Sequence, residues 1–398
     1  MLDKHFPKTP ILLRRIDGHA AWANSVALEI AGVSSDSKVD GGSVLLSKGE
    51  PNGILIDNAI GLVASKIPAA TEKEMINALQ QAESNCFSVG LTSVQDAGLS
   101  RTVVQLIDSL HRADALKIRM NTWLSPSREN FTHFVEKGPY QSDYLTVNTI
   151  KLFTDGALGS RGARMIEAYS DDPGNLGLYV TPLEELEKYC QRAYQNNFAV
   201  ATHCIGDGAN RETLKIYADI LGGENDRRWR IEHAQIIHPD DFHYFGDFNI
   251  IPSVQTSHAT SDMYWAEDRV GSERIKGAYA YRQLLEQNGW LPNGSDFPVE
   301  QINPLFGFYA AVVRKDQTGF PGEGFQMENA ISREEALRAM TIWAARSGFE
   351  EDLKGSIETG KLADLVITST DLMSAPDSEL FGIKVQATYS GGELVYSR

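Results

Sequence analysis

Apolar and polar positions along this chain predict strands and helices in regular alternation. Short apolar, β-rich runs are separated by segments with helical periodicity, at spacings of about 20–50 residues. Seven runs are predicted strands: 90–96, 117–124, 145–153, 198–203, 229–233, 249–255 and 290–296. Strands that alternate with helices indicate βα units around a parallel sheet. Seven strands are many for a doubly wound sheet and one fewer than a (β/α)8 TIM barrel needs.

Capping patterns mark where several of the intervening helices begin. Thr71 and Glu74 have the spacing of a capping box and predict a helix over residues 71–85. Pro182 is predicted at the first position of another helix. A further helix is expected around residues 240–248, and Ser332 with Glu335 predicts one that runs to about 346.

Both ends of the chain differ from this regular middle. Residues 1–70 read as short apolar runs between turns such as Gly41-Gly42, so we expect an irregular insert there. Residues 71–350 carry the predicted barrel. Residues 351–398 look like an added β unit, because residues 361–367 and 385–396 are β-rich runs and Gly391-Gly392 forms a turn within the second one.

Composition limits the classes of partner. The 398 residues carry 37 Lys and Arg against 53 Asp and Glu, a net charge of −16. This argues against nucleic acid and anionic membrane surfaces as partners. Three cysteines do not make a disulfide framework, and no apolar run reaches the roughly 18 residues of a membrane span. The start also lacks the pattern of a signal peptide, so we expect a cytoplasmic globular protein.

Polar side chains at the ends of predicted strands suggest chemistry. Lys151 lies in the third run, His203 and His233 end the next two, and Asp296 ends the last. In a TIM barrel the carboxyl ends of the strands converge on the active site. Two imidazoles and a carboxylate suit zinc or another divalent metal. Such a metal activates water, and a neighbouring carboxylate takes its proton.

Each of these residues could also have a purely structural role in the core. A single histidine at a strand end is ordinarily a hydrogen-bonded core residue, but two on neighbouring strands with Asp296 favour a metal site. Lys151 lies in an apolar run, where burying an amine is costly unless it has a role. His19 and His258 remain undecided between a structural and a functional role. The other five histidines are expected to be structural: His5, His111, His133, His238 and His243.

Several motifs occur in the order found in a known family. They are residues 148–163, 201–208, 230–235, 252–258, 294–298 and 355–366. Together they resemble the amidohydrolase superfamily, in the branch that includes N-substituted formamide deformylases. Residues 15–24 resemble an insert that follows the first barrel strand in that branch. The resemblance implies an insert or lid at 1–70, a metal-dependent hydrolase barrel at 71–350 and part of a small β-sandwich at 351–398.

The resemblance implies a hydrolase that cleaves a C–N, amide-like bond of a small molecule. Lys151 would be carboxylated and hold one metal or bridge two, with His203 and His233 as further ligands. Asp296 would be a ligand and the general base, and His258 would polarise the carbonyl or contact the substrate. Zinc is the expected metal, although other divalent ions and one or two sites remain open.

Four further residues are candidate substrate contacts. The resemblance implies that Arg161 supports the site from a nearby loop. Trp22, Tyr264 and Trp265 are aromatic candidates for an apolar pocket that would suit an N-aryl or N-alkyl amide, with ordinary packing as the alternative.

One departure from the family concerns the first metal site. The family's first strand supplies a His-x-His pair, whereas the nine histidines here are all isolated. We therefore expect a barrel without its first strand, about one metal at most, weak activity, and open edges that leave a homo-oligomer as an alternative. Full activity would require His19 or His258 to replace the pair.

Two alternatives to a full hydrolase were considered. One is a truncated, catalytically impaired homologue that acts as a binding or assembly protein. The other, a nucleobase deaminase, is disfavoured because neither His203 nor His233 is followed within a few residues by a glutamate.

Overall fold

A curled, mostly parallel sheet forms the centre of the computed structural model, which describes residues 1–398. Its strands follow the order β11-β10-β9-β8-β6-β5, and β7 pairs antiparallel with β8. The bounds are β5 Ser93–Leu99, β6 Arg119–Leu124, β7 Tyr140–Gln141, β8 Leu145–Phe153, β9 Ala199–Cys204, β10 Arg230–His233 and β11 Ile251–Ser253. Six of the seven predicted strands are thus confirmed, and the α/β class with them.

The seventh predicted strand, residues 290–296, is wrong. Only Asn293 forms an isolated parallel bridge, to Val254 beyond the end of β11. Pro292 has no N–H to donate, and the backbone turns at Asp296, where φ is 54°. The sheet pairing therefore ends at β11 and β5 without joining them. The architecture is an open half-barrel, and a closed TIM barrel is not seen.

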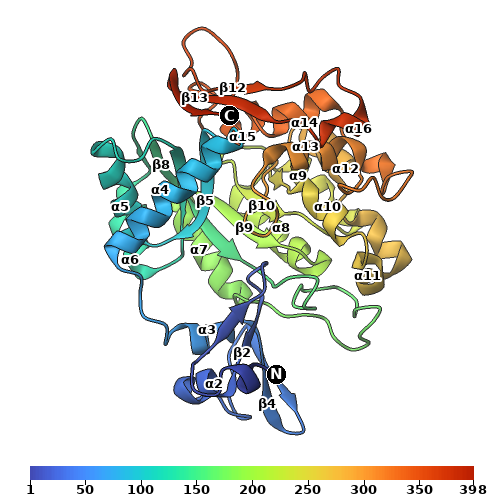
Figure 1. Ribbon diagram of the computed structural model, residues 1–398. Helices are drawn as coiled ribbons and strands as arrows, with labels where there is room; N and C mark the ends of the chain where they lie inside the picture. Colours follow the sequence, from blue (N-terminus) through green and yellow to red (C-terminus); the bar gives the residue numbers. More distant parts are fainter.

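Helices surround the half-barrel sheet (Figure 1). They are α4 Glu72–Ser88, α5 Arg101–Arg112, α6 Arg128–His133, α7 Leu183–Gln195, α8 Asp207–Leu221, α9 His243–Asp247, α10 Thr256–Asp262, α11 Ala266–Arg274, α12 Tyr281–Asn288, α13 Pro304–Val313, α14 Arg333–Ala339, α15 Ile342–Ser347 and α16 Asp377–Leu380. Four short 3-10 helices are Val135–Lys137, Pro239–Asp241, Ile275–Gly277 and Met327–Asn329. None of the helices is both long and apolar enough to cross a membrane.

The caps were more predictable than the helix ends. Both predicted capping boxes form, at Thr71 with Glu74 and at Ser332 with Glu335. Pro182, however, is the N-cap of α7 rather than its first residue. The helix expected to run to about 346 is divided into α14 and α15 by the non-helical Thr341.

The main core lies between the sheet and its helices as one cluster of 61 buried residues. Residues 145–152 of β8 are buried without interruption, because helices and the barrel interior cover both faces of a parallel strand. This explains why the strands read as continuous apolar runs rather than as alternating ones.

The N-terminal segment is more regular than expected. It contains α1 Leu2–His5, β1 Leu12–Arg14, β2 Ala20–Ala23, α2 Ser25–Ala31, β3 Gly42–Ser47, β4 Glu50–Asp57 and α3 Ile60–Ala64. Its strands form an antiparallel sheet in the order β1-β2-β4-β3, over a separate core of eight buried residues. Asn58 Nδ2 donates to the Val180 carbonyl at 2.9 Å and ties this sheet to the half-barrel.

A second antiparallel sheet lies at the opposite end of the molecule from the N-terminal sheet (Figure 1). It consists of β12 Leu365–Thr368, β13 Val385–Ser390 and β14 Glu393–Ser397. The β13–β14 hairpin turns through Gly391-Gly392, as predicted. The division into domains at 1–70, 71–350 and 351–398 stays a prediction.

A buried ion pair fastens this sheet to the half-barrel. Arg119 of β6 and Asp364, beside β12, have side chains only 5% and 6% exposed, and Arg119 Nε lies 2.9 Å from Asp364 Oδ2. Asp364→Ala should lower the free energy of unfolding by about 3–5 kcal/mol, because it leaves a buried guanidinium without its counter-charge. Urea unfolding measures the change.

Lys117 and Glu393 provide the matched control, since they join the same two parts at 2.8 Å with Glu393 62% exposed. Glu393→Ala should have little effect on stability, because solvent screens the pair. Equal losses in the two variants would show that burial of Asp364 does not matter.

Candidate metal centre

Two histidines meet at the carboxyl ends of β9 and β10. The parallel register pairs Glu232 with His203 and His233 with Cys204, which offsets the two histidines by one residue. Their ring centroids lie 4.6 Å apart, with the planes at 75°. His203 is 3% exposed and His233 is 9% exposed. The structure thus brings together the two imidazoles that the sequence predicted as ligands.

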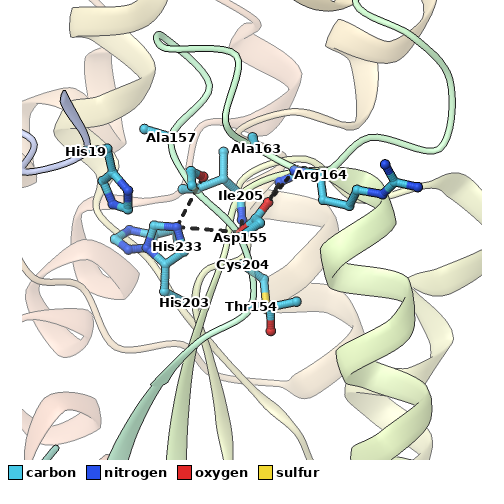
Figure 2. Close-up of polar contacts among 12 residues, drawn as sticks. His19, Thr154, Asp155, Ala157, Ala163, Arg164, His203, Cys204, Ile205 and His233 are labelled. Atoms are coloured by element: carbon cyan, nitrogen blue, oxygen red, sulfur yellow. Dashed lines mark hydrogen bonds and ion pairs between the residues drawn. The ribbon is translucent and has the colours of Figure 1, made fainter. Parts of the chain in front are cut away.

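One nitrogen of each ring already has an oxygen acceptor. His233 Nδ1 donates to Gln255 Oε1 at 2.7 Å. His203 Nε2 faces the Gly156 carbonyl at 3.3 Å (Figure 2). This leaves His233 Nε2 and His203 Nδ1 with lone pairs, the arrangement that outer hydrogen bonds impose on metal-binding histidines. Burial lowers the pKa of both imidazoles well below its usual value, which favours the neutral, ligating form.

The loops that hold these histidines are fixed by a buried carboxylate. Asp155 accepts hydrogen bonds from the backbone N–H groups of Arg164, Ile205 and Gly206, at 2.8 to 3.0 Å. It therefore joins the loop after β8 to the loop after β9 beside His203, whose Nε2 lies 3.5 Å from Asp155 Oδ1 (Figure 2). A rigid support of this kind is what a precise site requires.

Lys151 and Asp296 face a common cavity of 420 Å³, together with Glu232, His233 and Gln255. Lys151 is 5% exposed. Its Nζ lies 3.3 Å from the Leu152 carbonyl and 4.1 Å from the centre of the Phe153 ring. Burial lowers the pKa of this amine. Asp296 is exposed as a residue. Desolvation of its carboxyl by the surrounding protein nevertheless raises the pKa of that group to about 6, although the positive charge of Lys151 lowers it.

The backbone at two of these positions is unusual. His233 and Asp296 have φ values of 73° and 54°, in the left-handed region that side chains other than glycine seldom adopt. Residues in such conformations concentrate at functional sites, where the surrounding structure holds them. Both positions lie where a strand-like run turns away from the sheet, which aims the side chains at the cavity.

His258 and Glu232 are further buried polar groups at this centre. The His258 ring stacks on His233 with centroids 5.8 Å apart, and its Nε2 has no hydrogen-bond partner. Glu232 Oε2 accepts from Ser253 Oγ at 2.9 Å, whereas Oε1 has no partner within hydrogen-bond distance. Buried polar atoms are normally satisfied, so these orphan atoms indicate a site shaped for a further occupant.

The proposed substrate residues do not line the cavity. Trp22 lies in the N-terminal sheet, where it pairs with Leu13 and Ile54. Arg161 makes an ion pair with Asp171 at 2.8 Å. Tyr264 is 57% exposed and stacks on Phe320, and Trp265 lies against Gly159. Their assignment as substrate contacts stays a prediction.

His19 is the residue whose position the sequence did not settle. It comes from the N-terminal sheet, and its ring lies 4.9 Å from that of His203 (Figure 2). In the sequence, the only sign of a role for His19 was its place within residues 15–24, which resemble the family's insert.

The donor chemistry fits a divalent metal ion. His233, the carboxylate of Asp296 and the buried amine of Lys151 line one cavity, and His203 lies beside His233. One nitrogen of each imidazole is already hydrogen-bonded to an oxygen, as is usual for metal-binding histidines. No three His, Cys, Asp or Glu side chains form a complete metal-binding group as they stand. His203 and His233 therefore supply part of a metal site, and further ligands are needed to complete the coordination sphere.

Comparisons with known proteins agree with this chemistry. A model of the amidohydrolase family matches residues 1–396. The chain is 37% identical over 418 residues to Protein LONG AFTER FAR-RED 3 of Arabidopsis thaliana, covering 99% of this chain and 70% of that protein. It is 25% identical over 416 residues to the N-substituted formamide deformylase of Arthrobacter pascens, covering 100% of this chain and 75% of the enzyme.

A solved structure is similar over most of the chain. It is an uncharacterized metal-dependent hydrolase from Pyrococcus horikoshii, with a TM-score of 0.77 and 26% sequence identity. The match covers 93% of this chain and 73% of that one.

Proposed function

This chain belongs to the amidohydrolase family, and from that premise we propose that it hydrolyses a C–N, amide-like bond of a small molecule with the help of a divalent metal. One observation carries the proposal. Two neutral imidazoles, His203 and His233, stand side by side with a lone pair free on each, next to the cavity that Asp296 and Lys151 face. Metal-dependent hydrolases with similar folds support a metal cofactor.

We assign the metal ligands from this chain's own residues. His203 Nδ1 and His233 Nε2 would hold the ion, with Asp296 as a carboxylate ligand. Lys151 would add an anionic oxygen ligand if its neutral amine took up CO2 to form a carbamate with loss of one proton. Zinc suits a set of nitrogen and oxygen donors. When bound, it lowers the pKa of water and polarises a carbonyl oxygen.

The proton transfers fall to Asp296. Its carboxylate faces the cavity and can accept a proton from the attacking water as the new C–O bond forms. As the C–N bond breaks, the same carboxyl returns that proton to the leaving amine. His258 stacks on His233. In its neutral form, the His258 imidazole would donate a hydrogen bond to the substrate carbonyl. The Arthrobacter relative is an N-substituted formamide deformylase, which suggests N-substituted formamides as the first substrates to test.

A second candidate function is a binding or assembly protein without strong catalysis. Two observations favour it: no three side chains form a complete metal group, and the sheet is an open half-barrel. Metal content and turnover separate the two functions.

Metal removal should abolish hydrolysis. Chelator-treated protein, assayed with N-substituted formamides and N-acyl amines, should lose turnover and recover it with Zn²⁺, Mn²⁺ or Co²⁺. His203→Ala should not recover, because one ligand is gone, whereas His238→Ala, which changes a histidine outside the centre, should recover fully. A chain that binds no divalent metal and hydrolyses none of these amides would establish the binding function instead.

A further inference from the structure

A histidine–aspartate pair reaches the metal centre from the N-terminal sheet. His19 immediately precedes β2 and Asp57 ends β4, and the pairing of these two strands brings the residues together. Asp57 N donates to the His19 carbonyl at 3.1 Å. The side chains also meet, because His19 Nδ1 lies 2.6 Å from Asp57 Oδ1. The His19 side chain is 17% exposed and that of Asp57 only 1%.

Asp57 sits in a recess that glycines provide. A Cβ on Gly156 or on Gly162 would collide with Asp57 Oδ2. Both glycines belong to the loop that follows β8, the strand of Lys151. The motif after Lys151 thus leaves space for a carboxylate that comes from a different sheet. Larger residues at either position would push the N-terminal sheet away from the centre.

The burial of Asp57 is not explained by local hydrogen bonds. Its Oδ2 has no hydrogen-bond partner, and its backbone adopts φ 47°, which is strained for aspartate. Burying a carboxylate with one oxygen unpaired costs free energy unless the group has a role. Its one side-chain partner is His19, so the role is to fix the position and the tautomer of that ring.

Three imidazoles therefore form a row. The rings of His19 and His203 lie 4.9 Å apart and those of His203 and His233 lie 4.6 Å apart. One nitrogen of each ring lies at hydrogen-bond distance from an oxygen. The partner of His19 is Asp57, and His203 and His233 face the Gly156 carbonyl and the Gln255 side chain. With Nδ1–H directed at Asp57, His19 keeps the lone pair on Nε2. All three rings thus show the same division between an outer hydrogen bond and a free donor nitrogen.

We propose that His19 is a third imidazole ligand of the divalent metal and that Asp57 is its positioning residue. The N-terminal sheet would then complete the metal centre of the half-barrel. This inference rests on the proposed function, because it requires the metal. As the three side chains are not yet a complete metal-binding group, the His19 ring must turn towards the ion when it binds.

Metal affinity, not turnover, provides the test. Apo protein is titrated with Zn²⁺ in competition with a chromophoric chelator. Asp57→Asn should weaken binding about 10–100-fold, the usual effect of removing an outer partner of a ligating histidine. His19→Ala should weaken it at least as much. His238→Ala is the matched histidine control and should bind Zn²⁺ as the unchanged chain does.

Two further measurements separate ligation from a structural role. In Co²⁺-loaded protein, His19→Ala should change the visible absorption bands, because a ligand is lost, while the melting temperature of the apo protein stays near that of the unchanged chain. If His19→Ala does not fold, His19→Gln and Asp57→Asn carry the same test with side chains closer in size.

The outcomes distinguish this inference from the proposed function. If His203→Ala loses Zn²⁺ while His19→Ala and His19→Gln bind it with unchanged affinity and unchanged Co²⁺ bands, His19 is not a ligand and the hydrolase proposal stands. If the unchanged chain binds neither Zn²⁺ nor Co²⁺, both the hydrolase and the third ligand are overturned.

Discussion

Asp296→Asn should reduce kcat by about 10²–10⁴-fold in the metal-loaded chain, the range that general acid–base catalysis contributes. An amide can neither accept the proton of the attacking water nor return it to the leaving amine. Asparagine matches the size of aspartate and tolerates the φ of 54° at this position, so the fold should be unchanged. The measurement is kcat at saturating substrate, with bound metal determined for each sample.

Metal content must be measured because Asp296 is also a proposed ligand. Comparing samples with equal metal occupancy isolates the proton transfer from metal loss. Asp262→Asn is a matched control, since Asp262 is a carboxyl group at the end of α10 that hydrogen-bonds to Tyr279 and has no assigned chemistry. Unchanged turnover in Asp296→Asn at full occupancy would remove Asp296 from the mechanism.

Lys151→Ala should lose bound metal, and bicarbonate should help to load the unchanged chain. A protonated amine is a poor ligand, but burial lowers the pKa of Lys151 and so favours the neutral amine, which can form a carbamate with CO2. The carbamate supplies anionic oxygen where the strand otherwise offers none. Metal content after reconstitution with and without bicarbonate is the readout.

A second buried lysine controls for burial itself. Lys354 is 7% exposed and makes an ion pair with Glu350 at 3.0 Å, in a different part of the molecule. Lys354→Ala should lower stability but leave the metal content and the bicarbonate effect intact. If the Lys151→Ala variant binds metal stoichiometrically and as tightly as the unchanged chain, a carbamate on Lys151 is not a metal ligand.

The strands and helix caps of the half-barrel that depend on a few neighbouring residues were predictable from the sequence. Six strands and two capping boxes form as expected, because continuous apolar runs and Thr71 or Ser332 caps act over a few residues. Residues 290–296 begin with the apolar pair Trp290-Leu291 but continue through Pro292 and Gly294, and they follow a different path. A strand needs a partner with free N–H and C=O groups, and here pairing stops after one bridge.

In the N-terminal sheet, the shortness of β1 and β2 hid its regularity. β1 and β2 have three and four residues, too few for an alternating pattern to stand out from turns. Their stability comes from packing over eight buried residues contributed by both strands and helices. Such packing is a property of the assembled unit and leaves little trace in any one segment.

By itself, the sequence predicted the order of the βα units and placed Lys151, His203 and His233 on consecutive strands. Strand ends and their polar residues are local features, and parallel strands bring their carboxyl ends to one edge. Only the tertiary structure decided that His19 and Asp57 stand beside His203, in space that Gly156 and Gly162 leave free. That contact depends on how one sheet docks against another, and no periodicity or spacing within either segment encodes the docking.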